Sequence, residues 1–228
     1  MNPNADRVIF AVDVASEDRA RSLIAALGPY VGTFKLGLEL LLRGGMDLVA
    51  RVAAGAPVFV DAKLHDVPAT VGRSVRQIVG GPNPVRFITV HGAVSAAVEA
   101  AEGQAGILLV TVLTSEDPAL HGGPEALRDR VVARAVAAME LGAAGVVCAP
   151  TEAQAVRHAI GPEGVIVTPG VRPAWAAVAG DDQRRTATPA EALAAGASMV
   201  VIGRPLRDAP DPVEAARRLL AEIVQTPK

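Results

Sequence analysis

Apolar residues along this chain follow two alternating patterns. Short runs rich in β-branched residues predict strands, and longer stretches with apolar residues three and four positions apart predict helices. One helix is predicted from the apolar positions Leu127, Val131, Val132, Ala135, Val136 and Met139. We expect eight strands, at Val8–Asp13, Thr33–Leu36, Val58–Lys63, Phe87–His91, Ile107–Leu113, Gly145–Cys148, Val165–Thr168 and Met199–Gly203.

Eight alternating strands and helices predict a (β/α)8 barrel of the TIM type. Near-continuous apolar strands such as 107–110 are typical of a parallel sheet covered by helices. An open doubly wound sheet is the alternative, but the first turn, 13–16, lacks its glycine-rich dinucleotide fingerprint. No linker-like tract interrupts the pattern, so we expect residues 1–228 to form one catalytic domain. Ser16 and Thr151, each followed by acidic residues, are predicted N-caps.

Composition excludes several classes of partner. Lys and Arg total 22 against 24 Asp and Glu, so the net charge of -2 offers no bulk attraction for nucleic acid or an anionic membrane. Cys148 is the single cysteine, which excludes an intrachain disulfide and a multi-cysteine zinc site. No signal peptide or apolar run of roughly 18 residues is evident, so we expect a soluble, cytoplasmic protein.

The stretch from Asp61 to Asp66 carries a cluster of charges at the end of an apolar strand. Side chains alternate along a strand, so Phe59, Asp61 and Lys63 point the same way. Opposite charges that end an apolar face are costly unless they are paired, which makes this cluster a candidate for chemistry.

Polar residues also stand at the ends of other predicted strands. In a barrel of this kind the reacting groups lie at the carboxyl ends of the strands. A helix cap or a turn could explain any one of these residues, but together they indicate one active-site rim. They are Asp13, Lys35, Asp66, His91, Thr111, Thr114, Ser115, Gly203 and Arg204.

The connection between Thr168 and the predicted helix cap at Thr188 is the second signal. Connections longer than about 12 to 15 residues are usually functional or disordered. Loops after the seventh and eighth strands often form a phosphate site, for which Arg204 and the N–H groups near Gly203 are natural donors. We therefore expect a phosphorylated substrate, with a solvated loop as the alternative. The connection carries Arg172, Gln183, Arg184 and Arg185.

A set of motifs extends over essentially the whole chain, at Phe34–Gly37, Asp61–Pro68, Val110–Ser115, Val147–Pro150, Thr168–Pro173, Asp182–Arg185 and Ile202–Pro205. Together these motifs resemble those of the orotidine 5′-monophosphate decarboxylases. The D-x-K-x-x-D core is shared by a wider superfamily, whereas the full set in this order is specific. One departure is Ala69, where the family often has Asn.

The resemblance implies decarboxylation of orotidine 5′-monophosphate to uridine 5′-monophosphate (UMP) and CO2, the last step of de novo pyrimidine synthesis, without metal or organic cofactor. It implies that Lys63 delivers a proton to C6 of the ring and that Asp61 lies beside the departing carboxylate. Lys35 and Asp66 would complete an alternating chain of charges.

The resemblance also implies a homodimer in which Asp66 and Thr70 reach into the neighbouring subunit's site. Asp13 and Lys35 would hold the ribose, and Thr114 the pyrimidine side. Phosphate binding would close the 170–187 loop. The phosphate region would be held by Arg172, Gln183, Gly203 and Arg204.

Two other functions stay open at this point. A metal-dependent sugar-phosphate decarboxylase or synthase of the same superfamily also carries D-x-K-x-x-D, but Lys35 would be an unfavourable neighbour for a divalent cation. A barrel that binds a nucleotide without catalysis is the other alternative.

Overall fold

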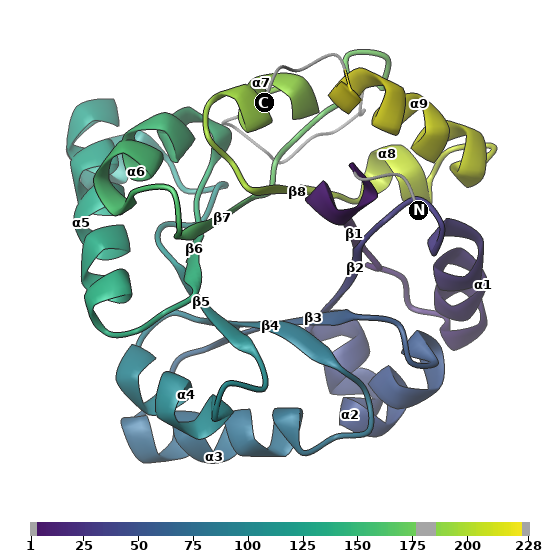
Figure 1. Cartoon of the computed structure of the whole chain (residues 1–228), viewed down its shortest axis with the longest axis horizontal. Helices are drawn as coiled ribbons and strands as arrows, with labels where there is room; N and C mark the ends of the chain where they lie inside the picture. The colour runs from purple at the N-terminus through teal and green to yellow at the C-terminus, as the bar shows by residue number, and fades with distance from the viewer. Residues whose placement is uncertain (1–3, 177–185, 225–228) are drawn as a thin grey trace.

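The computed structural model describes residues 4–176 and 186–224. Its eight parallel strands pair in chain order, and β8 closes on β1 to form a barrel surrounded by helices (Figure 1). This closure confirms the predicted (β/α)8 barrel and excludes the open doubly wound sheet. The strands are β1 (Val8–Ala11), β2 (Thr33–Gly37), β3 (Val58–Leu64), β4 (Val85–Val90), β5 (Gly106–Val110), β6 (Gly145–Val147), β7 (Val165–Thr168) and β8 (Met199–Ile202).

Helices follow the strands and pack around the outside of the barrel (Figure 1). None of those in the described part of the chain combines the length and apolar character needed to cross a bilayer. The α-helices are α1 (Glu17–Leu27), α2 (Leu38–Ala53), α3 (Pro68–Val79), α4 (Val94–Ala101), α5 (Pro124–Glu140), α6 (Ala153–Ile160), α7 (Pro189–Ala194), α8 (Arg204–Arg207) and α9 (Pro212–Val224). Short 3-10 helices are η1 (Ala5–Arg7), η2 (Pro118–His121) and η3 (Pro150–Glu152).

Of the three predicted helix N-caps, two are confirmed and one is wrong. The Ser16 hydroxyl accepts the N–H of Arg19 at the start of α1, as predicted. Thr188 forms a capping box with Glu191 in α7. The cap predicted at Thr151 is wrong, because this residue lies inside η3 and its hydroxyl donates to the adjacent Glu152 carboxylate.

Apolar side chains form two layers, one inside the barrel and one between strands and helices. Inside, Phe59 and Phe87 meet edge to face with ring centroids 6.0 Å apart. This inner layer fills the barrel below its carboxyl rim, so only the rim is available for a ligand. The inner layer consists of Ile9, Ala11, Phe59, Phe87, Leu108, Val167, Met199 and Val201.

Several strands end before their predicted last residue. Asp13, His91 and Leu113 were expected inside strands but lie in the connections that follow β1, β4 and β5. At the carboxyl rim the chain leaves the ladder to enter the next helix, so apolar or β-branched character alone does not extend the strand. The consequence is functional, since these residues stand on loops at the rim.

Candidate active site

A cavity of about 540 Å³ opens at the carboxyl ends of the strands. Its floor is the top of the inner apolar layer, where Phe59, Val167 and Val201 contribute to the lining. Most of the predicted site residues also line it. They are Asp13, Lys35, Asp61, Lys63, Thr114, Ser115, Arg172, Gly203 and Arg204.

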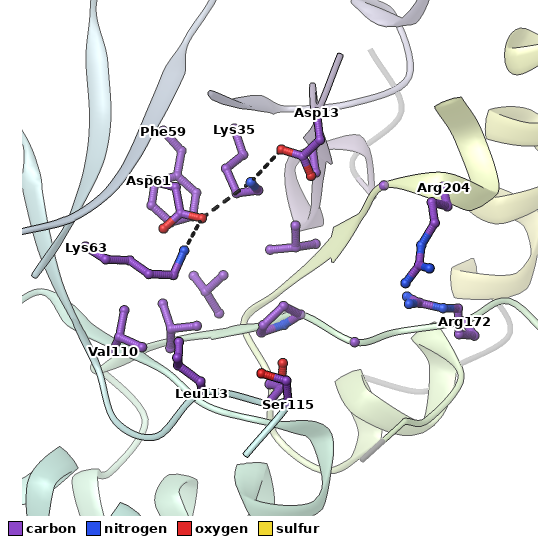
Figure 2. Close-up of a pocket in the computed structure, with 18 of the residues that line it drawn as sticks. Asp13, Lys35, Phe59, Asp61, Lys63, Val110, Leu113, Ser115, Arg172 and Arg204 are labelled. Atoms are coloured by element: carbon purple, nitrogen blue, oxygen red, sulfur yellow. Dashed lines mark hydrogen bonds and ion pairs between the residues drawn. The ribbon is translucent and has the colours of Figure 1, made fainter. Parts of the chain in front are cut away.

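Four charged side chains form an alternating chain along one wall of the cavity (Figure 2). The Lys63 ammonium lies 2.8 Å from Oδ2 of Asp61, and the Lys35 ammonium lies 3.4 Å from the same oxygen. Lys35 also lies 3.1 Å from Oδ1 of Asp13. The order is therefore Asp13, Lys35, Asp61, Lys63, and each ammonium of the chain has at least one carboxylate partner.

The chain of charges forms because β1, β2 and β3 are neighbours in the barrel. In the ladder Ala11 pairs with Lys35 and Gly37 pairs with Asp61, which brings the charged side chains to adjacent positions on the rim. The predicted alternation along β3 is confirmed, since Phe59, Asp61 and Lys63 all face the cavity.

Burial and charge pairing shift the pKa values of Asp61 and Lys35 in opposite directions. Burial alone raises the pKa of the Asp61 carboxyl, but the ammonium groups of Lys35 and Lys63 outweigh it, so the pKa lies below its usual value. Burial likewise opposes the charged form of Lys35, but Asp61 and Asp13 raise its pKa above the usual value. Both groups are therefore ionised at neutral pH.

The backbone of Lys63 has an unusual conformation. Its φ of 48° is in the left-handed region, which side chains other than glycine adopt at a cost. The regular pairing of β3 with β4 shifts between Val60 and Leu64, so Lys63 lies within an irregular stretch of the strand. Its N–H donates to the hydroxyl of Thr89 at 3.0 Å.

A second charged region lies on the opposite side of the same cavity. Arg172, in the connection after β7, and Arg204, at the start of α8, turn their guanidinium groups toward one another (Figure 2). Gly203 precedes Arg204 and lines the cavity, as does Thr114 in the connection after β5. Gln183, Arg184 and Arg185 lie outside the described residues, as do the other residues of 177–185 in the 170–187 loop to which closure was assigned.

Asp66 and Thr70 do not line the cavity of their own chain. Asp66 is exposed, and its Oδ1 accepts the N–H of Val67 at 2.6 Å. The Thr70 hydroxyl accepts from Arg73 on the surface of α3. The structure therefore separates these two residues from the other members of the predicted site.

Two other residues of the predicted rim also lie apart from the cavity. His91 lines a different hollow, beside Arg134, and burial lowers its pKa, with the nearby Arg134 charge adding to this effect. The Thr111 hydroxyl donates to the carbonyl of Val147 at 2.8 Å and thereby joins the ends of β5 and β6. Thr111 thus has a structural contact rather than a place in the lining.

Two residues near the charges were not predicted. Thr89 is fully buried, and its hydroxyl donates to Oδ1 of Asp61 at 2.8 Å. Arg207 of α8 lines the cavity and donates to the carbonyl oxygen of Asp13 at 2.9 Å. The spacing of Thr89 two positions after Phe87 gives both the same face of β4, which was the available signal.

Comparison with known proteins identifies a matching family. The family model described as "Orotidine 5′-phosphate decarboxylase / HUMPS family" matches residues 6–219. The chain belongs to this family. It is therefore an enzyme of a carboxy-lyase family, which bears out the resemblance noted in its motifs.

Relatives within this family match over nearly their whole length. The orotidine 5′-phosphate decarboxylase of Rhodopseudomonas palustris (strain BisB5) is 48% identical over 96% of this chain and 95% of the relative. That of Thermobifida fusca (strain YX) is 47% identical, with 96% of each chain covered. The crystal structure of orotidine 5′-phosphate decarboxylase from Lactobacillus acidophilus gives a TM-score of 0.80 at 29% identity, covering 96% of this chain and 99% of that one.

Proposed function

We propose that this protein decarboxylates orotidine 5′-monophosphate to UMP and CO2 and so serves pyrimidine synthesis. The observation that carries the proposal is one cavity with two separate charged regions. One region is the row of alternating charges that ends in Asp61 and Lys63, and the other is the pair of Arg172 and Arg204. A nucleotide has the matching polarity, with a reactive base at one end and a phosphate at the other. Membership of the family supports the same reaction.

The reaction leaves an electron pair on a carbon atom with no good electron sink. When the bond from C6 to the carboxylate breaks, CO2 departs and its bonding pair stays on C6. The Lys63 ammonium interacts most strongly with the negative charge that develops at this point, which favours the transition state over the ground state. It then gives its proton to C6 as a general acid and regains one from water.

Asp61 has a supporting part in this proposal. Two like charges about 4 Å apart repel by roughly 4 kcal/mol at an effective dielectric of 20, so Asp61 against the substrate carboxylate would supply only part of the acceleration. Very slow reactions can require on the order of 20 kcal/mol. The remainder must come from preorganised charges and from binding energy of the distant phosphate, which holds the ring against Lys63.

The phosphate end of the substrate is assigned to Arg172, Arg204 and the backbone at Gly203, with Gln183 as a further member from outside the described residues. A planar guanidinium group can donate two parallel hydrogen bonds to two oxygens of one phosphate. Two arginines that face one another therefore suit a phosphate bound between them. Asp13 and Lys35 would contact the ribose, and Thr114 the pyrimidine side.

We infer that the working enzyme is a homodimer in which Asp66 and Thr70 serve the neighbouring site. Three observations support this inference: both residues lie outside their own cavity, Asp66 is exposed, and Val67 beside it is 62% exposed although apolar. A second copy packed on this part of the rim would cover Val67 and extend the charge chain beyond Lys63. We also place the enzyme in a reducing cytoplasm, because a chain with a single cysteine can form no disulfide within itself.

The metal-dependent alternative is disfavoured by the surroundings of Asp61. Such enzymes use carboxylates to bind Mg²⁺, but here the Asp61 carboxylate already has two ammonium neighbours. Among the described residues no three His, Cys, Asp or Glu side chains converge in a way that could hold a metal ion.

A direct assay separates the three functions. Purified protein is mixed with orotidine 5′-monophosphate, and the ultraviolet absorbance of the base is followed with and without excess chelator. The proposal expects the same turnover in both conditions. Turnover that stops with chelator would favour a metal enzyme, and tight UMP binding without turnover would favour a non-catalytic barrel.

A further inference from the structure

Thr89 occupies a buried position between the two groups that the proposed reaction uses. Its side chain is fully buried in β4, and its hydroxyl makes two hydrogen bonds. It donates to Oδ1 of Asp61 at 2.8 Å and accepts the backbone N–H of Lys63 at 3.0 Å. One side chain thus connects the carboxylate of Asp61 to the main chain of Lys63.

The first bond fixes the rotation of the Asp61 carboxylate. The terminal torsion of an aspartate is broad, so neighbours decide which oxygen faces which partner. With Oδ1 occupied by Thr89, Oδ2 is the oxygen that meets both Lys63 and Lys35. Loss of the Thr89 hydroxyl would leave Oδ1 buried without this donor and would free the carboxylate to turn.

The second bond supports the unusual backbone of Lys63. Between the pairs Val60–Ile88 and Leu64–Val90, β3 advances four residues while β4 advances two. The N–H of Lys63 donates to the Thr89 side chain in this irregular stretch, where a regular ladder would offer a main-chain carbonyl. A left-handed conformation persists only where surrounding contacts hold it, and this bond is one such contact.

We propose that Thr89 is a positioning residue whose hydroxyl sets the Asp61 carboxylate and the Lys63 backbone in their productive relation. The inference deepens the proposed function and rests on it for its kinetic consequence. Thr89 does not line the cavity, so it acts through Asp61 and Lys63, which do. Its effect should fall on the chemical step rather than on nucleotide affinity.

Two matched pairs of proteins isolate the Thr89 hydroxyl. In the first pair, wild type and Thr89→Val differ in that a methyl group of similar size replaces the hydroxyl. In the second pair, Thr89→Ser keeps the hydroxyl without the methyl group and Thr89→Ala lacks both, so this pair is decisive if the Val protein does not fold. We expect kcat to fall about ten- to a hundredfold in Val and Ala, because a hydrogen bond to a charged group is lost. Ser should stay within about threefold of the wild type, and KM and UMP affinity should change little.

A spectroscopic measurement tests the same claim without turnover. The sequence has three lysines, Lys35, Lys63 and Lys228, so ¹⁵N-lysine labelling gives at most three backbone amide signals. The Lys63 signal is assigned by its loss in Lys63→Arg. It should shift in Val and Ala but stay near its wild-type position in Ser, while the Lys35 signal moves little in all three.

The outcomes are distinguishable. Normal kcat in Val and Ala, an unmoved Lys63 signal, or losses of UMP affinity as large as those of kcat would each overturn the positioning role. If the wild-type protein has no turnover at all, the proposed function fails. The amide signals would then still decide whether Thr89 holds Lys63.

Discussion

The Lys63 ammonium lies 2.8 Å from Oδ2 of Asp61 while Lys35 approaches the same oxygen from β2. Asp61 therefore contacts two ammonium groups at the cavity wall. Lys63 is the last of the four charged side chains in this row, and its side chain is 33% exposed, so it has room to meet the base of a nucleotide. In the proposed function Asp61 would hold Lys63 in place, and Lys63 is the group expected to react.

Replacing Lys63 with Ala should remove turnover and leave UMP binding largely intact. General acid catalysis contributes about 10²–10⁴-fold, so kcat should fall by at least that order. The measurement is kcat from the absorbance assay together with UMP affinity by calorimetry. Lys63→Arg is the matched control, since it keeps the positive charge but gives up a proton poorly. Near-normal turnover in either protein would contradict the assignment.

Much of this site could be predicted from the sequence because strand geometry carries it. Alternation along β3 places Asp61 and Lys63 on one face, and the pairing of β1, β2 and β3 in chain order brings Asp13 and Lys35 beside them. Lysine usage is a further signal in the same direction. Three of the 22 basic residues are lysines, and two of these line the cavity. The two lysines give the Asp61 side of the cavity compact ammonium groups, whereas the arginines of the cavity, Arg172, Arg204 and Arg207, are elsewhere in its lining.

Other parts of the site could not be predicted, for physical reasons. Thr89 is an ordinary strand residue by propensity, and its contact with Lys63 depends on a shift in the pairing of β3 with β4. Arg207 is one of many arginines, and its place at the cavity follows from the packing of a four-residue helix. The cap predicted at Thr151 failed because the chain enters α6 through a 3-10 turn.

Arg204→Ala should weaken the binding of UMP far more than that of uridine. Hydrogen bonds from a charged group are worth about 1.5–3 kcal/mol, so UMP affinity should fall on the order of ten- to a hundredfold while uridine affinity changes little. Titration of both ligands into each protein gives the ratio. Arg21→Ala, on the surface of α1, is the control and should change neither affinity. Equal losses for UMP and uridine would remove the phosphate role from Arg204.

The charge chain should make folding stability sensitive to acid. Because the folded pKa of Asp61 lies below its unfolded value of about 3.9, its stabilisation is complete above that pH and is lost as the pH falls through the folded pKa. For Lys35 the pKa shift is in the opposite direction, because its pKa is raised in the folded protein. Its contribution to stability therefore persists up to the unfolded value of about 10.4 and is lost only in stronger alkali.

Asp61→Asn tests this dependence by urea unfolding between pH 3 and pH 8. At neutral pH the variant should be less stable by on the order of 3 kcal/mol, since two ammonium groups lose their shared partner. The difference should begin to shrink below about pH 3.9, where the unfolded carboxyl takes up a proton before the folded one does. A difference that stays constant down to pH 3 would mean that the ionised carboxylate does not stabilise the fold.

The assignment of Asp66 to the neighbouring site predicts that two inactive proteins restore activity when their subunits mix. Asp66→Ala still has its own Lys63, and Lys63→Ala still has its own Asp66. A mixed dimer therefore contains one site with both residues and one with neither. Random pairing of equal amounts makes half of the dimers mixed, so about one quarter of wild-type activity should appear.

Co-expression with two different affinity tags isolates the mixed dimer and gives its kcat per site. Asp61→Ala mixed with Lys63→Ala is the matched control, because Asp61 and Lys63 contact one another within a chain and no intact site can form. Recovery in the first mixture and none in the second would place Asp66 across the interface. If Asp66 instead acts within its own chain, both mixtures stay inactive, since each site in the first then lacks either Lys63 or Asp66.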